Sequence, residues 1–326
     1  MTRVYLSEQG STGHKRGGRL EIEKDGLLLR RVPLAQVEQV VVVGKGIQLT
    51  TALMVDLVQR GVEIALVSRA GRYYGKIVGA PNGSTAVRMA QYLYLSDRPA
   101  TIRFVRTMVE QKIAFQHRHL LAFPSLATAA LRIAGLGPGL AAAGSIDQIR
   151  GFEGAAAAAY WQALVTVVPA SWGFRGRRHY PAPDPTNALL SFGYTLLLQE
   201  LVAAINLAGL DPFLGALHTP DPSRPSLALD LEEPLRPLGI DTWVLDTILR
   251  GVIRPSQFVR DGERILLDPE GRRQFLALYE RQMERRVRHP LAPGRIRVRQ
   301  AIELHVRLAV QVFSGLRASL EPVEWQ

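Results

Sequence analysis

The sequence predicts an α+β fold, with a small, mostly β N-terminal domain followed by a larger helical domain that carries one small β-hairpin. Short apolar runs separated by turn residues fill roughly the first 80 positions, which is typical of strands. From about residue 86 the apolar residues recur at helical spacing, as in RFVRTMVEQKIAFQHRHLLAF (103–123). We therefore predict a β domain at 1–80, a linker at 81–89 beside the turn-rich APNGST, and a helical domain at 90–326.

Four segments define the predicted β domain. RLEIEKDGLLLRRVPL (19–34) places Lys-Asp-Gly between two apolar runs, which indicates a hairpin. VEQVVVVG (37–44) predicts a buried strand, and EIALVSRAGRYYGKIVG (63–79) predicts two strands joined by a glycine-containing turn. Between them, Thr50 or Thr51 is placed to cap a short helix, ALMVDLVQRG, that ends at a glycine.

In the helical domain, the run ALLSFGYTLLLQELVAAINLAGL (188–210) is long enough to span a bilayer. Gln199, Glu200 and Asn206 interrupt it, so we predict a buried core helix and no membrane partner. Further on, FVRDGERILL (258–267) has the pattern of the small hairpin. Asp268-Pro269 then opens a long helix, with aspartate as N-cap and proline in the first position.

The charge balance favours a nucleic-acid partner. The formal net charge is +11, and arginine supplies most of it, since lysine occurs only at positions 15, 24, 45, 76 and 112. The flat guanidinium suits two-pronged phosphate contacts, whereas the alternative is simply a solvated basic surface. Cysteine is absent, which excludes disulfides, cysteine-ligated zinc and thiol catalysis. Together with an N-terminus that lacks an apolar leader, this predicts a cytoplasmic protein.

Candidate DNA-binding arginines cluster in two places. The helix opening at residue 268 is expected to continue through Arg281, Arg285, Arg286 and Arg288, although Glu280 and Glu284 interleave and a solvated face is the alternative. Arg177 and Arg178 precede the core helix. Such residues would bind phosphates without distinguishing between bases, so that the affinity for DNA falls steeply as the salt concentration rises.

Glu153 stands in almost wholly apolar surroundings, GFEGAAAAAYWQALV (151–165). A run of alanines on a helix allows another backbone to approach closely, so we expect this segment to be buried. A carboxylate there is costly unless a charged group lies beside it. The alternative is a first-turn glutamate favoured by the helix dipole.

A histidine and two carboxylates follow in the second half of the chain. If 226–233 is helical, Asp230 and Glu233 share a face while Glu232 points elsewhere, and the Pro- and Asp-rich loop before it would bring His218 close. With Glu153, such groups suit Mg²⁺ or Mn²⁺. Alternatively His218 is a hydrogen-bonded structural histidine, and the carboxylates are solvated or pair with arginine.

Two longer runs carry a family resemblance. The first is NALLSFGYTLLLQELVAAINLAGLDPFLGALH (187–218), and the second is RPSLALDLEEPLRPLGID (224–241). Together with the upstream GFEGAAAAAYW, these runs resemble the CRISPR-associated protein 1 family, the integrases and endonucleases of CRISPR spacer acquisition. The resemblance covers essentially the whole chain. It implies that Glu153, His218 and Glu233 are catalytic metal ligands, with Asp230 as a possible fourth ligand or a support.

The resemblance also implies partners and a reaction. We expect an Mg²⁺- or Mn²⁺-dependent enzyme that inserts short DNA duplexes into the CRISPR array by attack of a 3′-hydroxyl on a phosphodiester. We also expect a homodimer formed through the β domain, and a second small CRISPR-associated protein. The alternative is a non-catalytic DNA-binding scaffold that holds DNA ends.

Three further residues carry expectations from the same resemblance. Tyr160, seven residues after Glu153, is expected to line the site, with a core aromatic as the alternative. Arg236 is expected to contact phosphate or orient a carboxylate. Phe115 departs from the family, many members of which have asparagine before the glutamine that corresponds to Gln116.

Overall fold

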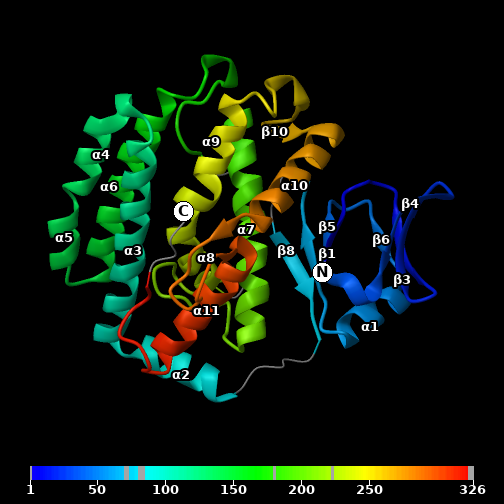
Figure 1. Cartoon of the computed structure of the whole chain (residues 1–326), viewed down its shortest axis with the longest axis horizontal. Helices are drawn as coiled ribbons and strands as arrows, with labels where there is room; N and C mark the ends of the chain where they lie inside the picture. The colour runs from blue at the N-terminus through cyan, green and yellow to red at the C-terminus, as the bar shows by residue number, and fades with distance from the viewer. Residues whose placement is uncertain (1, 70–72, 80–84, 179–180, 222–223, 322–326) are drawn as a thin grey trace.

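Two four-stranded sheets form the N-terminal domain (Figure 1), in a computed structural model that describes residues 2–69, 73–79, 85–178, 181–221 and 224–321. The first sheet has the order β1–β5–β7–β8, and only β8 is antiparallel to its neighbour. Its strands are β1 (Thr2–Leu6), β5 (Val37–Val43), β7 (Glu63–Val67) and β8 (Tyr73–Ile77). The second has the order β4–β3–β2–β6. Its strands are β2 (Thr12–Arg16), β3 (Arg19–Lys24), β4 (Leu27–Pro33) and β6 (Gln48–Leu49).

The local signals in the described part of this domain are confirmed, while residues 70–72 of the turn predicted within 63–79 lie outside that part. Strands β3 and β4 pair as the predicted hairpin, and its two turn residues, Asp25 and Gly26, have φ values of 51° and 78°, as a two-residue hairpin turn requires. Thr50 caps helix α1 (Thr51–Gln59) by accepting a hydrogen bond from the Leu53 N–H at 3.4 Å. A separate hydrophobic core, with Leu20 and Leu53 fully buried, holds the sheets and α1 together.

The helical domain begins with α2, whose first five residues (85–89) lie inside the predicted linker of 81–89, so these positions are helical; residues 81–84 of that linker lie outside the described residues. Its main helices are α2 (Thr85–Ser96), α3 (Arg98–Leu121), α4 (Ala127–Ala134), α5 (Gly137–Ala142), α6 (Ile146–Val165), α7 (Pro185–Ala208), α8 (Ser226–Glu232), α9 (Thr242–Leu249), α10 (Pro269–Glu284) and α11 (Val298–Phe313). Short turns of 3₁₀ helix are η1 (Leu34–Gln36), η2 (Pro124–Leu126), η3 (Ala170–Trp172), η4 (Glu233–Leu235) and η6 (Pro255–Gln257), and η5 (Pro237–Asp241) is a π-helical turn.

Helix α7 is the predicted core helix. Among the described residues, two segments are long and apolar enough to span a membrane, α7 and Pro124–Ala142. The apolar window of α7 is 72% buried, and α7 packs against α8, α9 and α11. The second segment is 22% buried and consists of η2, α4 and α5. The apolar surface of α7 is therefore used inside the domain, as Gln199 and Glu200 led us to expect.

Two small hairpins, rather than the one predicted, accompany these helices. The predicted pair is β9 (Phe258–Asp261) with β10 (Arg264–Leu267), and Asp268 caps α10 as expected. The second pair, β11 (Arg286–Val287) with β12 (Ile296–Arg297), was missed. The expectation that the helix continues to Arg288 is therefore wrong. Arg285 already has extended backbone angles, and its carbonyl accepts from the Val298 N–H at 2.8 Å.

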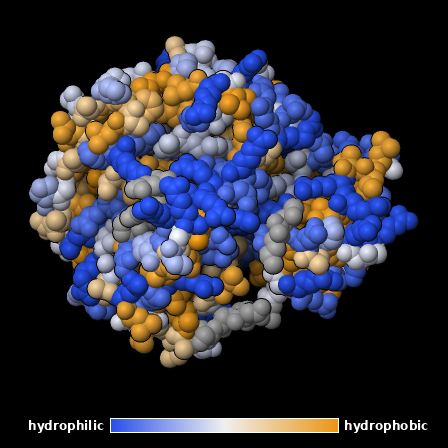
Figure 2. Space-filling view, in the orientation of Figure 1, coloured by the Kyte–Doolittle hydropathy of each residue, from blue (hydrophilic) through white to orange (hydrophobic). Residues whose placement is uncertain are grey.

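Strand β1 joins the two domains. Figure 1 shows it beside α10, and Arg3 forms an ion pair with Glu200 of α7. Tyr5 donates its hydroxyl proton to Glu280 of α10 at 2.8 Å, and Arg299 of α11 pairs with both glutamates. Hydrophilic residues gather across the middle of the face that Figure 2 shows. The two domains are therefore tied by buried and half-buried charges.

Candidate active site

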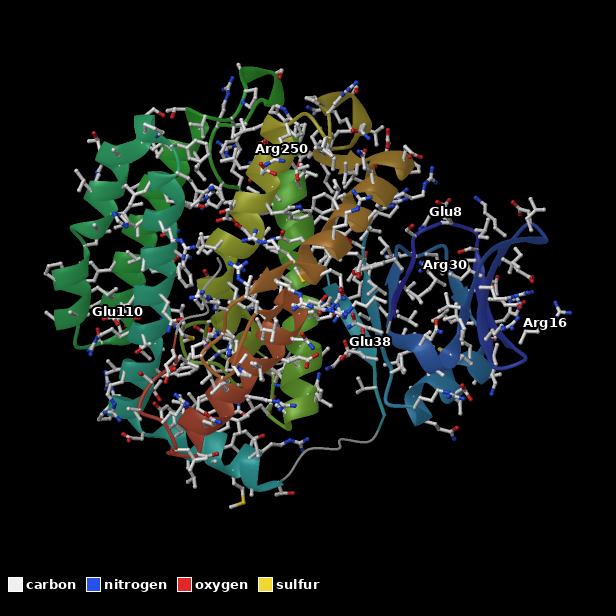
Figure 3. All side chains as sticks on the ribbon, viewed as in Figure 1. Glu8, Arg16, Arg30, Glu38, Glu110 and Arg250 are labelled. Carbon is white, nitrogen blue, oxygen red and sulfur yellow. The ribbon has the colours of Figure 1, made fainter. Side chains whose placement is uncertain are left out.

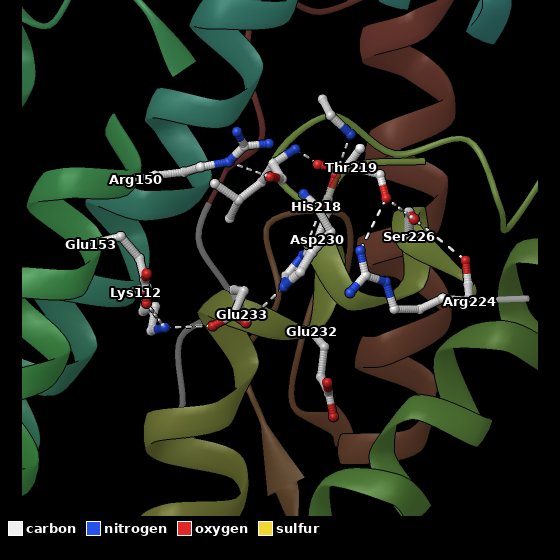
Figure 4. A network of polar contacts seen from close by, with 12 residues as sticks. Lys112, Arg150, Glu153, His218, Thr219, Arg224, Ser226, Asp230, Glu232 and Glu233 are labelled. Carbon is white, nitrogen blue, oxygen red and sulfur yellow. Dashed lines mark hydrogen bonds and ion pairs between the residues drawn. The ribbon is translucent and has the colours of Figure 1, made fainter. Parts of the chain in front are cut away.

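Asp230 holds His218 in one orientation (Figure 4). The Asp230 carboxylate is fully buried and accepts the backbone N–H groups of residues 216–218 at 2.5, 3.0 and 2.8 Å. It also contacts His218 Nδ1 at 2.8 Å. The loop packs so tightly on α8 that a Cβ at Gly215 would come within 2.6 Å of its backbone. Because Nδ1 is engaged, the other ring nitrogen, Nε2, is left for a ligand.

Cationic side chains contact both carboxylate oxygens of Glu233. It starts η4 directly after α8, is 4% exposed, and accepts from Lys112 Nζ at 2.5 Å through Oε2. Oε1 accepts from Arg236 and lies 3.8 Å from His218 Nε2. Burial alone would raise the pKa of Glu233, but Arg236, Lys112 and His218 outweigh it and hold the pKa at about 2. Glu233 is therefore a fixed carboxylate anion beside the histidine.

Glu153 approaches Glu233 from α6, with Lys112 between them. This helix begins at Ile146, so Glu153 is not a first-turn residue and the dipole alternative is wrong. Its carboxylate accepts from Lys112, which is the charged partner that the apolar surroundings required. The alanine segment is not wholly buried as expected. Ala157 is half-buried and Ala158 exposed, and both line a cleft.

Lys112 is the main residue that sequence reasoning missed. It lies on α3, is 7% exposed, and donates to Glu153 and Glu233. Burial would lower the pKa of its ammonium, but the two carboxylates outweigh burial and raise it. One signal was available, since Lys112 is the only lysine on a helix whose other basic side chains are arginine or histidine. Figure 4 shows that it lies between the two glutamates.

Tyr160 lies behind the site instead of lining it. It is fully buried, and its hydroxyl contacts Asp241 Oδ2 at 3.0 Å and His119 Nδ1 at 2.6 Å. Tyr194 donates to the other Asp241 oxygen at 2.5 Å. Burial raises the pKa of Asp241 to about 6, although both tyrosine hydrogen bonds oppose the rise. The core-aromatic alternative therefore describes Tyr160, and its neighbour Trp161 lines the cleft.

These groups open into a cleft of about 880 Å³. Its wall contains Glu153, His218 and Glu233, and basic side chains surround them. Those basic residues are Lys112, Arg175, Arg177, Arg224 and Arg236. Glu232 points away from the histidine, as predicted, and pairs with Arg236. The arrangement combines acidic and imidazole ligands with positive charge, which suits a phosphate ester held beside a divalent cation.

The predicted DNA-binding arginines separate into three kinds. Arg236 is half-buried and orients Glu232 and Glu233, while Arg177 lines the cleft and donates to Asn187 and Ser191. Arg178 is exposed beside it. The remaining four, Arg281, Arg285, Arg286 and Arg288, are exposed and are not among the residues that line the cleft. They form a separate basic surface at the end of α10.

The family departure at Phe115 concerns packing. Phe115 is 7% exposed and belongs to the helical core, whereas the next residue, Gln116, lines the cleft.

A second acidic–histidine group lies on the N-terminal sheet. The ligand atoms of His14, Glu21 and Glu23 lie within 4.8 Å of one another among the described residues. Arg31 already donates to one Glu21 oxygen at 2.6 Å. This group is remote in sequence from the cleft residues, and nothing in the sequence had drawn attention to it.

Fold and site together define a class of α+β proteins in which an acid–histidine cluster lies in a basic cleft. A family profile described as "CRISPR associated protein Cas1" matches residues 4–281. The chain is 37% identical to "CRISPR-associated endonuclease Cas1 2" of Rhodospirillum rubrum over 305 residues, covering 88% of each protein. The chain belongs to the Cas1 family, which confirms the resemblance seen in its sequence.

Two solved structures share the fold. One is a Cas1 protein from Thermotoga maritima, TM1797, with a TM-score of 0.85 and 22% identity, covering 97% of each chain. The other is a "Casposase bound to integration product", with a TM-score of 0.87 and 24% identity, covering 98% of this chain and 93% of that one. Both carry a similar fold along their whole length, which confirms the predicted fold class.

Proposed function

We propose that this chain is an Mg²⁺- or Mn²⁺-dependent DNA endonuclease and integrase of CRISPR adaptation, which inserts short DNA duplexes into the CRISPR array. Membership of the Cas1 family supports a nuclease or integrase. The observation that carries the metal dependence is the placement of Glu153, His218 and Glu233 on the wall of one basic cleft, where Lys112 joins the two glutamates and His218 Nε2 lies 3.8 Å from Glu233.

The donor set fits a divalent cation. His218 offers Nε2 because Asp230 occupies Nδ1, and two carboxylates, Glu153 and Glu233, complete three ligands. Asp230 already accepts four hydrogen bonds, so we assign it to orienting His218 and not to ligation. When bound, the cation would stabilise negative charge on a phosphodiester and polarise the attacking hydroxyl.

The protein's own residues would position DNA for that step. Arg175, Arg177 and Arg224 give the cleft wall a positive potential that attracts the phosphodiester. Arg236 fixes Glu233, so the carboxylate does not rotate away as charge develops. In the insertion reaction, a 3′-oxygen forms a new P–O bond as the target strand's 3′-oxygen leaves. Water in place of the 3′-hydroxyl would give cleavage.

The assembly is part of the same proposal. Residues 1–80 would form the homodimer contact and 90–326 the catalytic domain, with double-stranded DNA and a second small CRISPR-associated protein as partners. The exposed arginines Arg281, Arg285, Arg286 and Arg288 would hold DNA outside the cleft.

One gel assay separates this enzyme from the alternative, a scaffold that only holds DNA ends. Wild type, Glu153→Gln, His218→Ala and the exposed control Glu284→Gln receive a labelled duplex with free 3′ ends and a supercoiled target. Mg²⁺, Mn²⁺ or EDTA is present, with and without the small partner. We expect joining or cutting only with metal, in wild type and control, while all four bind DNA. If all four proteins bind DNA equally well without metal and none of them forms a product, the scaffold alternative is supported.

A further inference from the structure

Lys112 lies between Glu153 and Glu233, two of the three proposed metal ligands. Its side chain is 8% exposed, and it extends from α3 to Glu153 of α6 and Glu233 of η4. Both of its described hydrogen bonds end on groups that we assign to the metal. A buried ammonium is costly without such anions, and the buried Glu233 beside the half-buried Glu153 is costly without a cation.

Cationic side chains already contact both oxygens of Glu233, and their positive charge opposes the approach of a further cation. Oε2 accepts from Lys112 and Oε1 from Arg236. Arg236 is held elsewhere as well, since two of its nitrogens donate to Glu232 at 2.6 and 3.1 Å and its guanidinium lies 4.7 Å from the centre of the Tyr194 ring. Lys112 is held by the ligands themselves, on a flexible four-carbon stem. Of the two cationic side chains, Lys112 is therefore the one that can move away from Glu233.

The cleft also offers the displaced ammonium a place to go. Gln116, one helical turn further along α3, lines the cleft, and so does Asp241, whose carboxyl group interacts electrostatically with Lys112. The lysine can therefore swing within the cleft without losing every polar partner.

We propose that Lys112 is the resident counter-cation of the metal-free site. Its ammonium holds Glu153 and Glu233 together, and it exchanges with the divalent ion, so that metal binding must displace it. This inference rests on the proposed function, because it takes Glu153 and Glu233 as ligands. A residue that merely pinned α3 to α6 would contribute to stability without opposing metal binding.

The test is calorimetric titration of Mn²⁺ alone into EDTA-stripped full-length protein, counting only the binding that Glu153→Gln abolishes. A neighbouring charge alters a carboxylate's affinity for a proton by roughly 10- to 1000-fold, so we expect Lys112→Met to bind Mn²⁺ about 10-fold more tightly than wild type. Lys112→Arg keeps the charge and should bind no more tightly than wild type.

Lys76→Met is the matched control. Lys76 is also mostly buried and pairs with a glutamate, Glu63, at 3.3 Å, but in the N-terminal sheet. It should alter stability and leave Mn²⁺ affinity unchanged. In EDTA, Lys112→Met should melt about 5 °C or more below wild type, and saturating Mn²⁺ should abolish that difference, whereas Lys76→Met should not recover.

The outcomes are distinguishable. If wild type shows Glu153-dependent Mn²⁺ binding and Lys112→Met binds Mn²⁺ equally well or more weakly, the counter-cation role of Lys112 is overturned. The proposed metal-dependent function then still stands. No Glu153-dependent binding in any variant overturns both. If Lys112→Met does not fold in EDTA, recovery of folded protein on adding Mn²⁺ supports the exchange, and failure to recover overturns it.

Discussion

Arg236 is the residue whose removal should disturb the site most. Its guanidinium bridges Glu232 and Glu233, and these side chains are 1% and 5% exposed. Arg236→Met keeps the aliphatic bulk and leaves both carboxylates buried without this cation. The charged form of Glu232 depends on Arg236 more strongly than that of Glu233, because burial raises the pKa of Glu232 to about 7 even with Arg236 beside it.

The size of the effect follows from Glu233. Its pKa is lowered from 4.5 to about 2, a difference of about 2.5 units, which corresponds to about 3 kcal/mol of stabilisation shared by Arg236, Lys112 and His218. Because the folded-state pKa is lowered, this stability is fully present above pH 4.5 and is lost as the pH falls towards 2. Breaking a buried pair typically costs about 3–5 kcal/mol. We expect Arg236→Met to lose about 3 kcal/mol near neutral pH.

Urea unfolding near neutral pH measures this loss, with fluorescence of Trp161, Trp172 and Trp243 reporting the helical domain. The control is Arg250→Met, which breaks another i,i+4 pair, with Asp246 at 2.6 Å. That pair is exposed at the end of α9 (Figure 3), so the control should lose less than about 1 kcal/mol. Equal losses in the two variants would refute the argument that burial makes the Arg236 network important.

Three further results are expected. Asp230→Asn should weaken Mn²⁺ binding and DNA cleavage about 10- to 100-fold, because it frees the His218 ring; unchanged affinity would argue against orientation by Asp230. Reversing the charge of Arg281 and Arg285 should lower duplex affinity and flatten its dependence on salt by about 0.9 per lost phosphate contact, and an unchanged slope would exclude a DNA role. Burial lowers the pKa of His305 from 6.5 to about 3, so the free energy of unfolding should fall as the pH drops below about 6.5, by up to about 1.4 kcal/mol per pH unit. His305→Leu should reduce this dependence on pH, and an equal dependence in the variant and wild type would contradict the prediction.

Local chemistry explains what the sequence by itself determined. Asp25-Gly26, Thr50 and Asp268-Pro269 mark a turn and two helix starts through the backbone angles and hydrogen bonds of a few neighbouring residues. The histidine and its carboxylates could be predicted for the same reason, since Asp230 and Glu233 are three apart on one face and a single loop returns to them from His218.

Only the tertiary structure decided what meets those groups. Lys112 lies 41 residues from Glu153 and 121 from Glu233, and their contact depends on the packing of α3 against α6 and η4, which no local periodicity encodes. The same packing places Tyr160 behind the cleft and leaves alanines of α6 open to it. Likewise, α10 ends at Glu284 because β11 pairs with a strand about ten residues further on. Sequence thus indicates the histidine and carboxylates of the site, and packing specifies the cation that lies between Glu153 and Glu233.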